Sequence, residues 1–329
     1  MKYLHPLLLV VLLALSAWAS LCHRAPRAAA PVTPAATPSR TLAEVALPGA
    51  ALVASLDLVA LRGSLWGRVA LEQMLPLAGK SEQCARAVVD QVERLALAIP
   101  AEGSTSAAPE FGVIAEGNLQ ASPVVDCATL LLRAHGGEPE ASRLGGFLRL
   151  RDKSGRGELA VRDRGPLLLG GDSYFRALLE RASSAHAPSE GPREQLHSAL
   201  RRELGPAPLL VTWVLPPGWL QRWLGDSEVA RSPLAELRAL ALRGDIGEQL
   251  SLRATLAAEG AAGAERIATL LRGAQAEFRP VLDAVLGAGA SDRIRVAQSG
   301  QRVELSLVVD TQALVARWLD APLTPGARD

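Results

Sequence analysis

The residues from Asp292 to Asp310, DRIRVAQSGQRVELSLVVD, form a clear β-hairpin pattern. Apolar and polar side chains alternate on both sides of Gln298-Ser299-Gly300, which is a turn sequence. Such alternation is typical of antiparallel strands that bury one face. The stretch therefore predicts two paired strands, 293–297 and 302–309.

Helices are expected on both sides of this hairpin. Before it, apolar residues recur at helical spacing from Ala262 to Leu286, and Pro280 should kink this long helix. After it, a short helix is expected from Thr311 to Leu319. Because a helix buries its apolar stripe against a neighbouring layer, these elements predict an α+β unit.

The same order of elements is found earlier in the chain. Phe111 to Arg181 and Leu250 to Leu319 both read as strand, helix, hairpin and helix, although their residues barely match. This order predicts a tandem repeat of β-α-β-β-α units. The expected fold class is α+β, with two structurally similar halves, each an antiparallel sheet with helices packed on one face. The halves are 45–182 and 193–321, with a linker at 183–192 and a flexible tail at 322–329.

A resemblance to known proteins rests on AAGAERIATLLRGAQ, residues 261–275, followed by the hairpin and the short helix. This part of the chain, about Leu234 to Leu319, resembles bacterial exported or envelope proteins of unknown function that are built from tandem α+β repeats. Those proteins carry the repeats behind a signal or lipoprotein sequence. The resemblance implies the fold and an envelope location, and it implies no catalytic residues.

The N-terminus indicates export. Lys2 precedes an apolar run from Leu7 to Leu15, and Ala17-Trp18-Ala19 is a small-x-small cleavage pattern. Residues 1–22 are therefore a signal peptide or a membrane anchor. We rank soluble export first. An uncleaved anchor ranks second and stays open because Leu4 to Cys22 nearly reaches the length of a bilayer span. Lipidation of Cys22 ranks third, because Leu21 before it is not small.

An extended spacer is expected at 23–44. Its core, RAPRAAAPVTPAATPSR, is rich in alanine and proline and cannot bury enough apolar surface to fold. A spacer directly behind an export signal suits an anchored protein better than a free one. This observation argues against ranking soluble export first. We expect a periplasmic or other extracytoplasmic location, with membrane contact through the N-terminal segment as an alternative.

The bulk composition narrows the classes of partner. The chain has 329 residues, 49% of them apolar, and a formal net charge of +1. A nearly neutral protein has no overall electrostatic field that would attract nucleic acid or an acidic substrate, so no nucleic-acid partner is expected. The partners that stay open are an unknown envelope partner and an anionic surface.

A disulfide between Cys84 and Cys127 is predicted. These are the two cysteines of the folded part, and export places them where disulfides persist. Cys84 begins a helix that is expected to run to about Ala98, and Cys127 lies on the next helix. Both helices should pack on the same sheet, so the sulfur atoms can meet. The alternative is two buried free thiols.

A basic surface is predicted on the hairpin near Arg151. Alternation turns Leu148, Leu150, Leu159 and Val161 inward and basic side chains outward. We call these basic residues the basic ribbon: Arg149, Arg151, Lys153, Arg162 and Arg164. They could contact an anionic surface, although a solvated face is the commoner explanation of such a run.

No motif demands a particular chemistry. The fragment Ala78-Gly79-Lys80-Ser81 lacks the first glycine of a phosphate-binding loop. The histidines His135, His186 and His197 do not have the spacing of a metal site, and no cofactor is expected. Trp219 and Trp223 could stack on a sugar, but such a pair more often belongs to a core.

Three functions therefore stay open. The leading hypothesis is a non-catalytic envelope protein with a binding or scaffolding role. The second is an exported hydrolase whose site is assembled from distant residues. The third is a carrier of apolar ligands with a cleft between the halves.

Overall fold

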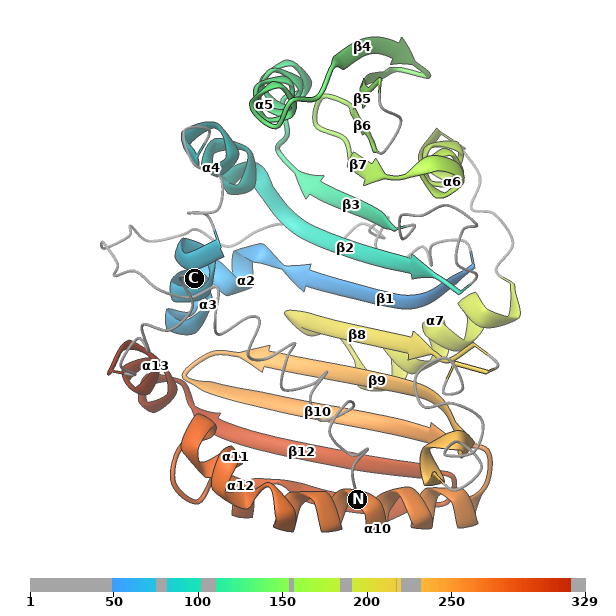
Figure 1. The fold of residues 1–329 in the computed structure, drawn as a ribbon, viewed down its shortest axis with the longest axis vertical. Helices are drawn as coiled ribbons and strands as arrows, with labels where there is room; N and C mark the ends of the chain where they lie inside the picture. The colour runs from blue at the N-terminus through green and yellow to red at the C-terminus, as the bar shows by residue number, and fades with distance from the viewer. Residues whose placement is uncertain are drawn as a thin grey trace.

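The computed structural model describes residues 49–74, 82–101, 111–153, 157–183, 191–216, 218–219 and 232–320. Figure 1 shows one broad sheet with helices around it. The strands are β1 Ala50–Asp57, β2 Val92–Pro100, β3 Gly112–Gly117, β4 Pro139–Leu144, β5 Phe147–Asp152, β6 Glu158–Val161, β7 Leu167–Gly170, β8 Leu209–Val214, β9 Leu237–Ile246, β10 Gln249–Ala258, β11 Arg295–Ser299 and β12 Arg302–Asp310. The helices are α2 Leu58–Gly63, α3 Leu65–Met74, α4 Glu82–Gln91, α5 Ala121–Ala134, α6 Asp172–Ser183, α7 Pro192–Leu204, η2 Pro233–Glu236, α10 Ala261–Glu277, α11 Arg279–Leu286, α12 Ala290–Arg293 and α13 Thr311–Asp320.

All described strands belong to one 12-stranded sheet in the order β11-β12-β10-β9-β8-β1-β2-β3-β7-β6-β5-β4. Each pair of neighbours is antiparallel. The α+β class with an antiparallel sheet is thus confirmed. The expected two sheets are one, because β1 and β8, the first strands of the two parts, pair with each other.

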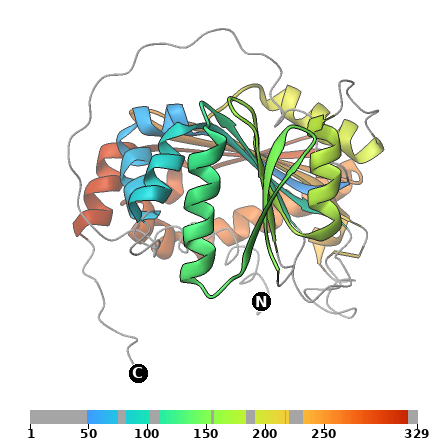
Figure 2. The ribbon, with the colours of Figure 1, turned by 90° about the horizontal axis from the view of Figure 1, so that it is seen from above.

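Helices cover both faces of this sheet. On β6, Leu159 and Val161 belong to the core under α2, α3, α5 and α13, whereas Ala160 belongs to the core under α6. Successive side chains of a strand point to opposite faces, so these two cores lie on opposite sides. Figure 2 shows α5 and α6 on either side of the strands. The expectation of helices on one face is therefore corrected.

The predicted β-α-β-β-α units differ in strand number. After β3 and α5 the chain forms four strands, β4 to β7, whereas after β10 and α10 it forms only β11 and β12 among the described residues. In both parts the last strand returns to pair with the strand before the long helix, as β7–β3 and β12–β10. The first part is thus not the predicted β-α-β-β-α unit, while the order of connections is shared. The division into two halves stays a proposal.

One predicted helix is partly a strand. Cys84 to Ala98 was expected to be helical from the spacing of Val88, Val92 and Leu95, but α4 ends at Gln91 and β2 begins at Val92. In VERLALAIP, Val92, Leu95 and Ile99 also satisfy a helical period, so the pattern suited both structures. The interior position of β2 between β1 and β3 selects the strand.

Other sequence predictions hold. The chain breaks at Phe278 between α10 and α11, two residues before Pro280, which occupies the first turn of α11. The hairpin β11–β12 forms as expected. The signal or anchor, the spacer, Cys22, the tail at 322–329 and most of the linker lie outside the described residues.

Candidate functional site

The middle of the sheet carries two apolar rows on one face. In the first row, neighbouring strands place Leu242, Val211, Ala54, Leu97 and Val113 side by side across β9, β8, β1, β2 and β3. In the second row, Leu240, Trp213, Leu52 and Ile99 follow one another across β9, β8, β1 and β2. We call these nine residues the open apolar face.

The open apolar face is incompletely covered although its strands are interior to the sheet. Leu52, Leu97, Val113, Val211 and Leu242 are half-buried. Ile99 is 41% exposed, and Phe111, which directly precedes β3, is 39% exposed. Large apolar side chains in the middle of a sheet are normally buried by another layer. Their exposure marks a surface that can accept an apolar partner.

Helices on the same face pack at its margins. Leu56 and Leu95, at one end of the rows, pack against the core that includes α2, α3, α5 and α13. Leu240 and Trp213 border the core that α10 covers. In Figure 1, α10 runs along β12, and α2, α3, α4 and α13 lie at the left ends of the strands. The helices thus frame the open apolar face.

Trp219 contributes to the frame. Its ring meets that of Trp213 edge to face, with centroids 5.4 Å apart, and it is buried in the same core cluster as Leu237. Trp219 is therefore part of the core, the more ordinary of the two roles expected for it. Trp223 lies outside the described residues.

The predicted disulfide between Cys84 and Cys127 is present. The two Cα atoms lie 5.6 Å apart, within the range of such bonds. The bond joins α4 to α5, which both lie on the face of the sheet that carries the open apolar face. The pairing predicted from cysteine count and compartment is confirmed, although the chain leaves its helix sooner after Cys84 than expected.

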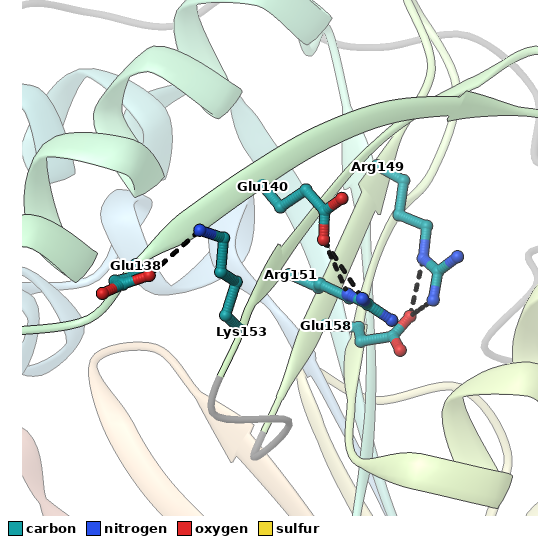
Figure 3. A network of polar contacts seen from close by, with 6 residues as sticks. All are labelled: Glu138, Glu140, Arg149, Arg151, Lys153 and Glu158. Atoms are coloured by element: carbon teal, nitrogen blue, oxygen red, sulfur yellow. Dashed lines mark hydrogen bonds and ion pairs between the residues drawn. The ribbon is translucent and has the colours of Figure 1, made fainter.

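The basic ribbon is accompanied by glutamates. Arg149 pairs with Glu158 at 2.5 Å, Arg151 with Glu140 at 3.1 Å and Lys153 with Glu138 at 3.0 Å. Figure 3 shows the three pairs as a ladder, in which Glu140 lies on β4, Arg149 and Arg151 on β5 and Glu158 on β6, while Glu138 and Lys153 lie next to the ends of β4 and β5. Glu140 lies on β4 and Glu138 directly before it, and this strand was not expected, whereas Glu158 lies on the expected strand β6. The pairs also raise the pKa of Lys153, chiefly through its hydrogen bond to Glu138.

The other two residues of the basic ribbon have separate surroundings. The Arg162 guanidinium lies 5.1 Å from the centre of the Phe147 ring, a cation–π distance. Arg164 has a positive φ of 53°, and its backbone N–H donates to Leu119 O in the turn before β7. The structure therefore does not gather the five cations into one unbalanced patch.

A buried polar seam lies on the opposite face, where α7 covers the β1–β8 junction. His197 is 1% exposed; its Nε2 donates to Ala50 O at 3.0 Å, and its Nδ1 accepts from the Thr212 hydroxyl at 2.8 Å. One turn earlier, Glu194 accepts from Gly49 N and from Arg181. Arg201 donates to the Ser55 hydroxyl. The α7 side chains thus contact both β1 and β8.

The neutral imidazole suits this seam. Burial is the main cause that lowers the pKa of His197, and the positive charges of Arg201 and Arg193 lower it further. The hydrogen bond to Ala50 and the charge of Glu194 oppose the shift. Because both ring nitrogens are hydrogen-bonded in the neutral tautomer, a structural role accounts for the burial of His197.

The described residues contain no group of three or more histidine, cysteine, aspartate and glutamate side chains that could hold a metal. His135 lies at the end of α5, where its Nδ1 donates to Leu131 O, and His186 is outside the described residues. An open hollow of about 500 Å³ lies between η2 and α10 and is lined by Pro233, Arg266 and Leu270 among others. None of the described helices is both long and apolar enough to cross a membrane.

The chain shows distant structural similarity to a solved protein named TP0453. Crystal form III of TP0453 matches with a TM-score of 0.49 and 13% sequence identity, covering 83% of this chain and 96% of that chain. Crystal form IV matches with a TM-score of 0.48 and 12% identity, covering 83% and 95%. No protein-family model and no curated protein matches the chain.

Proposed function

We propose that this chain is a non-catalytic binding protein that works outside the cytoplasm and holds an apolar partner on its open apolar face. The observation that supports the proposal is the pair of half-exposed apolar rows in the middle of the sheet. Burying such surface releases free energy of roughly 25 cal/mol per Å². A partner that covers the rows gains this energy.

The composition of the rows supports binding in preference to catalysis. Eight of the nine side chains are aliphatic, and the ninth is Trp213. They offer neither an acid, a base nor a nucleophile to a substrate. The apolar surface extends across the β1–β8 junction. An apolar ligand would therefore lie on the one sheet that both parts of the chain form, as a version of the apolar-ligand alternative.

The disulfide supports the location. Disulfides persist in oxidising compartments and are rare in the cytosol. The Cys84–Cys127 bond therefore agrees with the export signal expected from the N-terminal sequence.

A matched pair of variants tests the proposal. Ile99 and Val308 are β-branched strand residues with equal exposure, 41% each. Ile99 lies on the open apolar face, whereas Val308 points to the opposite face from its neighbour Val309, which belongs to the core. Fluorescence of an environment-sensitive apolar dye should rise on adding wild-type protein and Val308→Glu, and much less with Ile99→Glu. Equal dye binding by both variants would count against the proposal.

A further inference from the structure

We infer that the partner of the open apolar face is the acyl chain of a single lipid molecule. The inference rests on the proposed function and names the class of ligand. It follows from three properties of the face: its chemistry, its length and its frame of helices.

The chemistry of the face matches a hydrocarbon. Neither row contains a charged, hydroxyl or amide side chain, and the indole of Trp213 is the single side chain there with an N–H. Peptide partners are normally selected through polar or charged groups at the margins of an apolar groove. An acyl chain needs no such group along its length. A featureless aliphatic surface therefore suits a lipid tail better than an amphipathic helix.

The length of the face also fits. The first row crosses five neighbouring strands from Leu242 to Val113. Strands lie about 4.8 Å apart, so the row extends over about 19 Å. One leaflet of a bilayer has a hydrocarbon thickness of about 15 Å, which an acyl chain spans. A single chain can thus lie across the strands from β9 to β3.

The frame of helices excludes broader partners. On this face α10 packs on β10 to β12, and α5 packs on β5 and β6. A helix is about 10 Å thick, so both stand well above the strands between them. A flat bilayer, or the sheet of a second copy, would meet these helices before it reached Ala54 or Leu97. A single acyl chain is narrower than a helix and needs no flat approach to the sheet.

The inference is tested with saturated fatty acids of increasing length, from octanoate to stearate, titrated into the full chain by calorimetry. We expect one fatty acid per protein and an affinity that rises about fourfold per added CH₂, since each contributes about 0.8 kcal/mol. The rise should level off when the chain exceeds the row. Ile99→Glu should weaken binding of palmitate at least about tenfold, and Val308→Glu should leave it within about twofold, since only the first places a carboxylate on the row.

The outcomes separate the inference from the proposed function. An affinity that is independent of chain length, or unaffected by Ile99→Glu, would overturn the acyl-chain inference. If an apolar helical peptide displaced the dye and palmitate did not, the face would still be a binding surface, but for a helix. If the dye itself ignored Ile99→Glu, the proposed function would fail first. Binding to intact neutral vesicles that is lost in Ile99→Glu, without extraction of a lipid, would also overturn the inference of a single molecule.

Discussion

Val211 of β8 lies directly opposite Ala54 of β1, and this pairing joins the two parts of the chain into one sheet. The open apolar face extends across this junction on one side, and α7 closes it on the other. His197 on α7 contacts both strands, through Ala50 O on the β1 side and the Thr212 hydroxyl on β8. The open apolar face and the polar seam thus share the same two strands.

Stability should fall at mildly acidic pH because of His197. Its pKa is lowered in the folded protein, mainly by burial, so the unfolded chain binds the proton more readily. The contribution is complete above the ordinary histidine pKa of about 6.5 and is lost as the pH falls from there through the folded value. Urea unfolding at pH 7.5 and at lower pH should show this loss. In His197→Gln it should be absent, whereas His135→Gln, which changes an exposed histidine, should keep it. An unchanged pH profile in His197→Gln would contradict the assignment.

Glu194 should be among the most sensitive positions of α7. It is 7% exposed and pairs with Arg181 at 3.2 Å while accepting from the Gly49 backbone. Without the Glu194 carboxylate, the Arg181 cation and the Gly49 N–H each lose a hydrogen-bond acceptor. Glu194→Ala should therefore lower the free energy of unfolding by about 3–5 kcal/mol. Glu140→Ala, at the exposed pair with Arg151, should cost about 1 kcal/mol or less. Equal losses in denaturant unfolding would refute the distinction.

The disulfide should contribute substantially to stability. It closes a loop with a sequence separation of 43 residues, which is worth about 4 kcal/mol when the unfolded chain is constrained. The double variant Cys84→Ser/Cys127→Ser should unfold at a lower urea concentration than the wild type. Reduced wild-type protein should behave like the variant, and the non-reduced unfolded protein should show no reactive thiol from this pair. Two reactive thiols would disprove the bond.

The contact of the basic ribbon with an anionic surface stays a prediction. Because Arg149, Arg151 and Lys153 each have a glutamate partner, the ladder limits the positive potential of this face. The triple variant Glu138→Gln/Glu140→Gln/Glu158→Gln should therefore bind anionic vesicles more strongly than the wild type. Salt should weaken this binding by screening. Replacing Arg149, Arg151 and Arg162 with serine should abolish it. If neither triple variant alters vesicle binding, the basic ribbon is an ordinary solvated face.

Local patterns predicted the hairpins and most helices, because alternation and helical spacing depend on near neighbours. The hairpin around Ser299 and the helix break before Pro280 are examples. The local patterns gave the wrong structure for Val92 to Ile99. There the apolar residues fit both the helical and the strand period, and pairing with β1 decides for the strand. The strand β4 was missed because PEASRL carries no apolar alternation, and it forms as an edge strand against β5.

The disulfide was predictable because two cysteines leave one pairing. The open apolar face was not, since it arises from the register of five strands that are far apart in sequence. Its signal was present as consecutive apolar residues in AALVASLD and LLVTWV, which indicate strands whose two faces are both apolar. The sequence could not show that helices cover one of these faces less completely than the other.

The central claim is that an apolar ligand lies on the open apolar face, and photo-crosslinking with a diazirine-bearing palmitate tests it most directly. After illumination and peptide mapping, the account predicts labels on β1, β2 and β8, at or beside Leu52, Leu97 and Val211. Excess palmitate should suppress these labels, and Ile99→Glu should reduce them. Labels confined to other elements, such as the hollow between η2 and α10, would contradict the account.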